Sequence, residues 1–173
     1  MYSLKIDIPE NVKVEVDGKK VKVSGDKGQT ERSFLEKEVK IDIVDNKIVI
    51  SSESERKKTR ALIGTIVSHI KNMMIGVTKG FTYKLRVVFS HFPITVKVDG
   101  DKIVIQNFLG ERSARIAKIA GKAEVKIDGS DVIVSGVNVE DVGQTASRIE
   151  QSTRIVGYDK RKFMDGIYIV SKE

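Results

Sequence analysis

The chain carries one sequence pattern twice. The segment VKVEVDGKKVKVSG at residues 12–25 returns as ITVKVDGDKIVIQN at residues 94–107. Further along, VKIDIVDNKIVIS at residues 39–51 returns as VKIDGSDVIVS at residues 125–135. A solenoid needs at least three stacked repeats to bury a continuous core. A pattern that is present only twice therefore predicts two similar domains in tandem.

The repeat divides the chain into residues 1–81 and 82–173, and each part has the usual size of a small domain. Because the two parts share a scaffold, a feature found in only one of them is the first place to look for function.

Alternating apolar and polar residues on either side of short turns predict four β-hairpins. They cover residues 12–23, 39–51, 94–107 and 125–134, with Asp-Gly or Asp-Asn pairs at the turns. Residues 81–90 also alternate and contain neither Gly nor Pro, so we expect a strand there rather than a linker.

One amphipathic helix follows the hairpins in each part. In the first, residues 52–55 match a capping box, and Leu62, Ile66, Ile70 and Met73 recur at helical spacing.

In the second part, Asn138 is the expected N-cap, with Asp141 three residues on, and Val142, Ala146 and Ile149 form the apolar face. Each domain is therefore predicted to be an antiparallel β-sheet with one helix packed on a face, an α+β fold.

Composition excludes several classes of protein. The chain has no cysteine, which removes disulfides, thiolate metal sites and cysteine nucleophiles. Two histidines, His69 and His91, are too few for most histidine metal sites, and we expect no metal and no cofactor. No apolar run reaches the length of a membrane span and the N-terminus lacks a signal-peptide pattern, so a cytoplasmic location is expected.

The net charge of +7 indicates an anionic partner. The basic residues gather in three groups that contain few acids: Lys79, Lys84 and Arg86; Arg112, Arg115, Lys118 and Lys122; Arg154, Lys160, Arg161 and Lys162.

The second group recurs every third residue, with Ile116 and Ile119 between the bases. On a helical turn this spacing would align Arg112, Arg115 and Lys118 along one side. Two readings stay open: a row of phosphate contacts and an amphipathic segment with a solvated face.

The third group has no equally charged counterpart in the first domain. Lys160, Arg161 and Lys162 are consecutive and lie beside Phe163, and the Asp165-Gly166 pair predicts a turn into a final strand. Three cations on a loop suit a phosphate backbone, with the aromatic ring anchoring the loop.

An enzyme is poorly supported. The segments that begin at Ser54 and Ser68 match S-x-x-K, but the further motifs of that catalytic class are missing. Acid pairs such as Glu53/Glu55 lie where a helix first turn favours carboxylates.

Several motifs point to one family. They are HFPI at residues 91–94, NFLGE at 107–111, VIVSG at 132–136, VGQTA at 142–146 and, most specific, RKFMDGIY at 161–168. With the duplication, they resemble large-subunit ribosomal protein six in its archaeal form, whose eukaryotic counterpart carries the number nine. The resemblance covers essentially the whole chain.

This resemblance implies a non-catalytic constituent of the large ribosomal subunit. Such proteins bind large-subunit rRNA, chiefly through the second domain, near the stalk base and the region where translation factors dock. Arg161, Lys162 and Phe163 would lie in the RNA-contacting loop, and Asp165 and Gly166 would shape its turn. Tyr158 departs from the family pattern, which more often has a basic residue there.

We therefore expect a structural ribosomal protein with rRNA and neighbouring ribosomal proteins as partners, and with no membrane or small-molecule substrate. The expected rRNA-binding residues are Lys160, Arg161, Lys162, Phe163, Arg154, Arg112, Arg115, Lys118, Lys84 and Arg86. The alternatives are an RNA-binding module outside the ribosome and an enzyme that uses Ser68 or a carboxylate pair.

Overall fold

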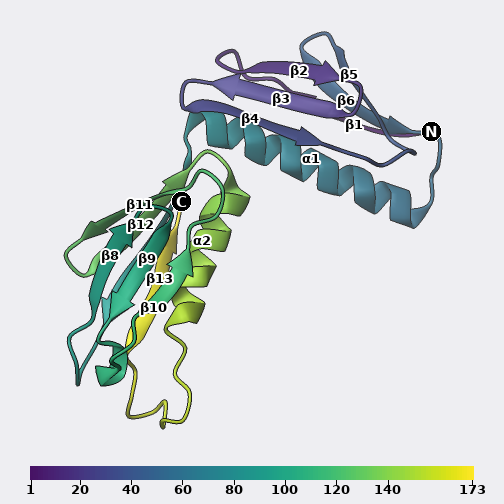
Figure 1. Cartoon of the computed structure of the whole chain (residues 1–173). Helices are drawn as coiled ribbons and strands as arrows, with labels where there is room; N and C mark the ends of the chain where they lie inside the picture. Colours follow the sequence, from purple (N-terminus) through teal and green to yellow (C-terminus); the bar gives the residue numbers. More distant parts are fainter. The chain divides into compact units, whose positions relative to one another are not determined.

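The computed structural model describes residues 1–173 as two compact units, Met1–Gly80 (unit 1) and Phe81–Glu173 (unit 2). Each unit combines antiparallel sheets with one long helix (Figure 1). The α+β class and the duplication predicted from the sequence are confirmed.

Unit 1 has two three-stranded antiparallel sheets, with strand orders β1-β6-β5 and β2-β3-β4. Its elements are β1 (Tyr2–Asp7), β2 (Lys13–Asp17), β3 (Lys20–Gly25), β4 (Gly28–Ser33), β5 (Lys40–Val44), β6 (Lys47–Ser52) and α1 (Lys57–Thr78).

Unit 2 has a three-stranded sheet of order β10-β9-β8 and a four-stranded sheet of order β11-β12-β7-β13. Its elements are β7 (Phe81–Val88), β8 (Thr95–Asp99), β9 (Lys102–Gln106), the 3-10 turn η1 (Phe108–Gly110), β10 (Arg115–Lys118), β11 (Glu124–Asp128), β12 (Asp131–Gly136), α2 (Val139–Ser152) and β13 (Gly166–Lys172).

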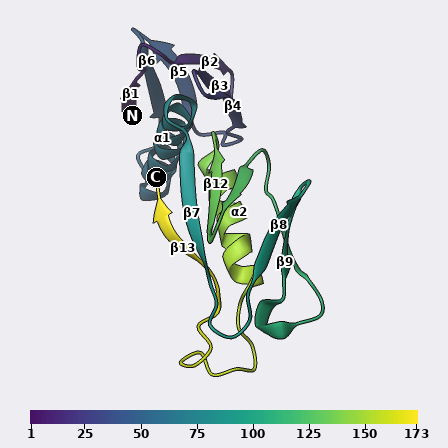
Figure 2. The ribbon, with the colours of Figure 1, turned by 90° about the vertical axis from the view of Figure 1, so that its left-hand side faces the viewer.

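The order of strands and helix in unit 1 returns in unit 2, with one added strand. Strands β7 to β12 and α2 follow the order of β1 to β6 and α1, and β13 is extra. Figure 2 shows β13 on the free side of β7, so that β7 is an inner strand whereas β1 is an edge strand. The duplicated fold therefore divides its strands between two sheets in each unit, and unit 2 alone continues past its helix into another strand.

The predicted hairpin turns are confirmed. Gly18 and Gly100 both have a φ of +60°, a left-handed conformation that glycine adopts without strain. The turn between β5 and β6 uses Asp45 and Asn46, with φ values of 49° and 60°. Asn and Asp tolerate this region better than other non-glycine residues.

Helix α1 begins later than the capping-box pattern predicted, and that prediction is wrong. Its N-cap is Arg56, which makes no side-chain capping hydrogen bond. Ser52 instead ends β6, and residues 53–55 form a polar connection before the helix, in which the Ser54 hydroxyl accepts a hydrogen bond from the Arg56 amide at 3.5 Å.

By length and hydropathy alone, α1 would be long and apolar enough to cross a membrane. Its apolar side chains are already used within unit 1, however: Ile63 and Ile70 are fully buried and Ile66 is 1% exposed. The helix contacts strands of both sheets. It is therefore the core helix of its unit.

Helix α2 begins as predicted. The Asn138 side chain accepts a hydrogen bond from the Glu140 amide at 3.0 Å, and Glu140 and Asp141 lie in the first turn. Val142, Ala146 and Ile149 are fully buried against the strands of unit 2. The amphipathic pattern and the cap together set where this helix starts and which face it buries.

Replacing Asn138 with Ala removes the acceptor for an otherwise unpaired amide at the start of α2. We expect unit 2 to lose about 1 kcal/mol of stability, measured by native-state hydrogen exchange of the α2 amides. The matched control is Arg56→Ala at the start of α1, where no side-chain cap exists to be lost. Equal losses in the two variants would contradict the capping account.

Candidate nucleic-acid interface

The loop of residues 153–165, between α2 and β13, belongs only to unit 2. It carries Arg154, Lys160, Arg161 and Lys162, and all four are exposed. At one end of unit 2 it lies beside the connection from β7 to β8 (Figure 2). The group of cations that has no counterpart in unit 1 thus lies on a loop that unit 1 also lacks.

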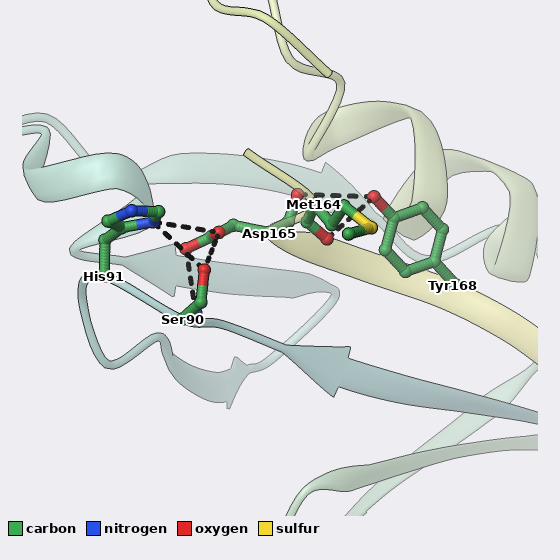
Figure 3. Close-up of polar contacts among 5 residues, drawn as sticks. All are labelled: Ser90, His91, Met164, Asp165 and Tyr168. Carbon is green, nitrogen blue, oxygen red and sulfur yellow. Dashed lines mark hydrogen bonds and ion pairs between the residues drawn. The ribbon is translucent and has the colours of Figure 1, made fainter. Parts of the chain in front are cut away.

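The end of this loop is fixed by a buried carboxylate. Asp165 is 0% exposed, and its side chain accepts hydrogen bonds from the Ser90 amide at 3.3 Å and the Ser90 hydroxyl at 3.0 Å. The His91 Nδ1 lies 3.7 Å from the same carboxylate and 3.0 Å from the Ser90 hydroxyl (Figure 3). A buried charge needs such partners, so these contacts hold the loop to the end of β7.

Gly166 and Tyr168 complete the turn into β13. The Tyr168 hydroxyl donates to the Met164 carbonyl at 3.1 Å (Figure 3). Gly166 has a φ of +155°, and a Cβ there would lie 3.2 Å from the Tyr168 hydroxyl and 3.4 Å from the Thr153 hydroxyl. These contacts leave little room for a side chain at Gly166, where the loop enters β13.

A row of three rings supports the middle of the loop. The Phe163 ring stacks on His91 with 4.7 Å between centroids, and Tyr158 lies tilted against Phe163 at 4.8 Å. These separations are typical of favourable aromatic pairs. Phe163 is therefore an anchor for the loop, as the sequence suggested.

One tight turn presents the three consecutive cations. The Asp159 carbonyl accepts from the Lys162 amide at 3.0 Å and the Phe163 amide at 2.9 Å. The Asp159 carboxylate accepts from the Arg161 guanidinium at 3.1 Å, and this hydrogen bond lowers the pKa of Asp159. Lys160 and Lys162 make no ion pair and are free to meet an anion.

The helical row predicted for Arg112, Arg115 and Lys118 is wrong. Residues 115–118 form strand β10, in which neighbouring side chains point to opposite faces. Arg115 shares the face of the buried Ala117, whereas Lys118 is exposed on the other face and Arg112 precedes the strand.

Arg115 acts as an internal clamp. Its guanidinium donates to both oxygens of Glu111, at 2.9 and 2.6 Å, and to the carbonyls of Ser152 and Arg154, each at 3.0 Å. It also covers the Phe108 ring at 4.4 Å. The hydrogen bonds that Arg115 donates to Glu111 lower the pKa of Glu111 and raise the pKa of Arg115. These contacts hold the end of α2 and the start of the loop.

Lys84 and Arg86 lie on one face of β7, opposite the buried Leu85 and Val87. Both pair with Asp131 of β12, at 3.2 Å and 3.3 Å. The hydrogen bond from Lys84, with a smaller contribution from Arg86, lowers the pKa of Asp131. The Asp131 carboxylate therefore offsets part of the positive charge of Lys84 and Arg86.

No catalytic group is assembled around the serine considered from the sequence. The Ser68 hydroxyl donates to the Gly64 carbonyl at 3.0 Å, within its own helix. The acid pair Glu53 and Glu55 is divided between an ion pair with Lys40 at 3.5 Å and one with the N-terminal amine at 2.7 Å. No cluster of three or more His, Asp or Glu residues is arranged to hold a metal ion.

Comparison with known proteins identifies the family. The model of the family described as ribosomal protein L6 matches residues 8–80 and 92–166, one segment in each unit. The chain belongs to the ribosomal protein L6 family. This family is structural and not enzymatic, in agreement with the sequence analysis.

Named relatives agree over nearly the whole chain. A protein named large ribosomal subunit protein uL6 from Aeropyrum pernix is 51% identical over 170 residues, covering 98% of this chain and 93% of the relative. Proteins of the same name from Methanosarcina mazei and Methanobrevibacter smithii are each 49% identical, covering 96% and 97% of this chain and 95% and 94% of the relatives.

Several residues that organise the site were missed from the sequence. Ser90 lies 75 positions from its partner Asp165. Glu111 forms an ion pair with Arg115, although the residues between them form no helix. The contact of His91 with Phe163 was not predicted either. The HFPI and RKFMDGIY motifs contain the residues on both sides of the contact between His91 and Phe163, but the sequence does not show that these residues meet.

Replacing Asp165 with Ala leaves the Ser90 amide and hydroxyl without their buried acceptor. We expect unit 2 to lose about 1–3 kcal/mol of stability in urea unfolding followed by its amide NMR signals. Asp165→Asn keeps one acceptor oxygen and should lose less, and the exposed Asp159→Ala is the control. Unchanged stability of the Asp165→Ala variant would contradict the anchor.

The clamp between Glu111 and Arg115 gives a pH signature. The pKa of Glu111 is lower in the folded protein than in the unfolded chain. The ion pair therefore contributes its full stability above the unfolded glutamate pKa, about 4.3. This stability is lost as the pH falls from there through the lower, folded-state pKa. Since both side chains are partly exposed, we expect the free energy of unfolding of wild type to exceed that of Glu111→Gln by about 0.5–1 kcal/mol at neutral pH. A gap of the same size at pH 2, in urea unfolding, would contradict this assignment.

Proposed function

We propose that the chain is a structural component of the large ribosomal subunit and that unit 2 binds large-subunit rRNA through the loop of residues 153–165. Family membership and the name shared by the relatives support the ribosomal role. The observation that carries the RNA contact is the anchored turn that exposes Lys160 and Lys162 with no acid partner.

The geometry suits a phosphate backbone. Phosphate contacts need exposed cations held in a fixed place, and a loop that is already ordered loses less entropy on binding. Asp165 and Phe163 fix the loop from within unit 2, and the cations point outward from it. Arg154, at the start of the loop, and Arg161 join the proposed contact surface.

The remaining cations have secondary places in this proposal. Arg112 and Lys118 are exposed and serve as additional phosphate contacts, and Lys84 and Arg86 contribute weakly because of Asp131. Arg115 is assigned to loop support, since its donors are engaged internally.

The proposed setting is the cytoplasmic ribosome, near the stalk base and the factor-binding region, with neighbouring ribosomal proteins as further partners. Unit 1 serves there as a spacer or as a surface for those proteins. The resemblance of the sequence motifs and the family match support this placement.

Replacing Lys160 and Lys162 with Ala should weaken binding to purified large-subunit rRNA and flatten its salt dependence. Each lost phosphate contact reduces the slope of log K against log salt by about 0.7–0.9, so the double variant should lose about 1.5. The control, Lys5→Ala with Lys13→Ala, removes the same charge from exposed positions of unit 1.

A slope that falls equally in the two double variants would show a general charge effect and contradict the loop assignment. Tight binding to short unrelated RNAs, with no preference for the rRNA, would favour the alternative of an RNA-binding module outside the ribosome.

A further inference from the structure

The row of three rings that supports the loop ends in an exposed aromatic residue. His91, Phe163 and Tyr158 follow one another with centroid separations of 4.7 and 4.8 Å. Phe163, in the middle, is partly buried, whereas Tyr158 at the end is 51% exposed. Phe163 contacts Tyr158 in a tilted arrangement, and about half of Tyr158 stays open to solvent and to a ligand.

The other end of the row contacts a buried carboxylate. His91 lies 3.7 Å from the buried carboxylate of Asp165, which also accepts two hydrogen bonds from Ser90. Tyr158 is followed directly by the turn at Asp159, whose carbonyl accepts from the amides of Lys162 and Phe163. The terminal ring thus packs on Phe163, and the backbone that carries it leads directly into a hydrogen-bonded turn.

Two unpaired cations follow Tyr158 in the sequence. Lys160 lies two residues beyond Tyr158 and Lys162 four residues beyond, and neither pairs with an acid. An exposed aromatic face combined with free cations matches the needs of a nucleotide, whose flat base stacks on a ring while its phosphate meets a cation. A fully paired duplex keeps its bases stacked on one another, so only an unpaired base can use this ring.

We propose that Tyr158 is a stacking platform for one unpaired nucleobase of the bound RNA, and that Lys160 and Lys162 hold the phosphates next to that base. This inference rests on the proposed function and adds to it: the loop selects RNA with a bulged, looped or terminal nucleotide in addition to contacting the backbone. The base becomes the next ring in the row after His91, Phe163 and Tyr158.

Two variants separate stacking from loop support. Tyr158→Leu removes the ring, and we expect it to weaken binding to purified large-subunit rRNA about ten- to a hundredfold with an unchanged salt slope, the size of one base–aromatic stack. Tyr158→Phe keeps the ring and should bind within about twofold of wild type. Phe92→Leu, which removes a 43% exposed ring outside the row, is the matched control and should bind as wild type does.

Ultraviolet crosslinking to the same rRNA, mapped by mass spectrometry, gives a direct readout. We expect a nucleotide adduct on Tyr158 in wild type and on the phenylalanine that replaces it in the Tyr158→Phe variant. The Tyr158→Leu variant should carry no adduct at this position.

Unchanged affinity of Tyr158→Leu, with no adduct on Tyr158 while the rRNA is bound, would overturn the stacking proposal and leave rRNA binding intact. A lower affinity accompanied by a flatter salt slope would show that the ring only supports the loop, which also overturns it. If wild type fails to bind the rRNA, both this inference and the proposed function are contradicted.

Discussion

The buried carboxylate of Asp165 determines how unit 2 presents its proposed RNA-binding surface. The loop of residues 153–165 has no regular secondary structure, so its shape depends on contacts with the strands around it. Asp165 joins the end of this loop to Ser90, which lies just past β7 and 75 positions earlier in the chain. Around that contact, the ring of Phe163 packs on His91 and the cations of the loop are left facing outward. A buried charge supplies a direction and a fixed point that exposed lysines cannot supply for themselves.

The duplication explains why such a loop exists in one unit only. Both units use the same order of strands and a single helix, but unit 2 continues into β13, which pairs with β7. The extra strand requires the chain to return from the end of α2 to the sheet, and the loop is the segment that makes this return. Arg115 supports its start, through the carbonyls of Ser152 and Arg154, and Asp165 supports its end. An addition to a repeated scaffold thus carries the features proposed for RNA binding, while unit 1 keeps the simpler form.

The local features of the fold were predictable because they depend on neighbouring residues. Turns such as Gly18 and Gly100, the cap at Asn138 and the apolar face of α2 follow from short-range patterns. The start of α1 was mistaken because its polar residues make a turn instead of a cap. The row of Arg112, Arg115 and Lys118 was mistaken because a spacing of three fits a helix but the segment pairs with β9 as a strand. Tertiary pairing overrode the local pattern there.

Some residues of the candidate site were likewise predictable from local sequence, and others were not. Lys160, Arg161, Lys162 and Phe163 could be found because they are consecutive and unmatched in the first domain, whereas Arg115 and Glu111 form a pair whose purpose depends on where α2 ends. The contacts of Ser90 and His91 with the loop join segments far apart in the sequence, and no single-sequence pattern specifies them.

The central claim, that this is a resident structural protein of the large ribosomal subunit, is tested most directly by sedimentation. The tagged chain, expressed in its own cells, would be followed through a gradient after a high-salt wash. The account predicts near-stoichiometric migration with the large subunit that persists through the wash. Migration as a free small protein, or complete release at moderate salt, would contradict it.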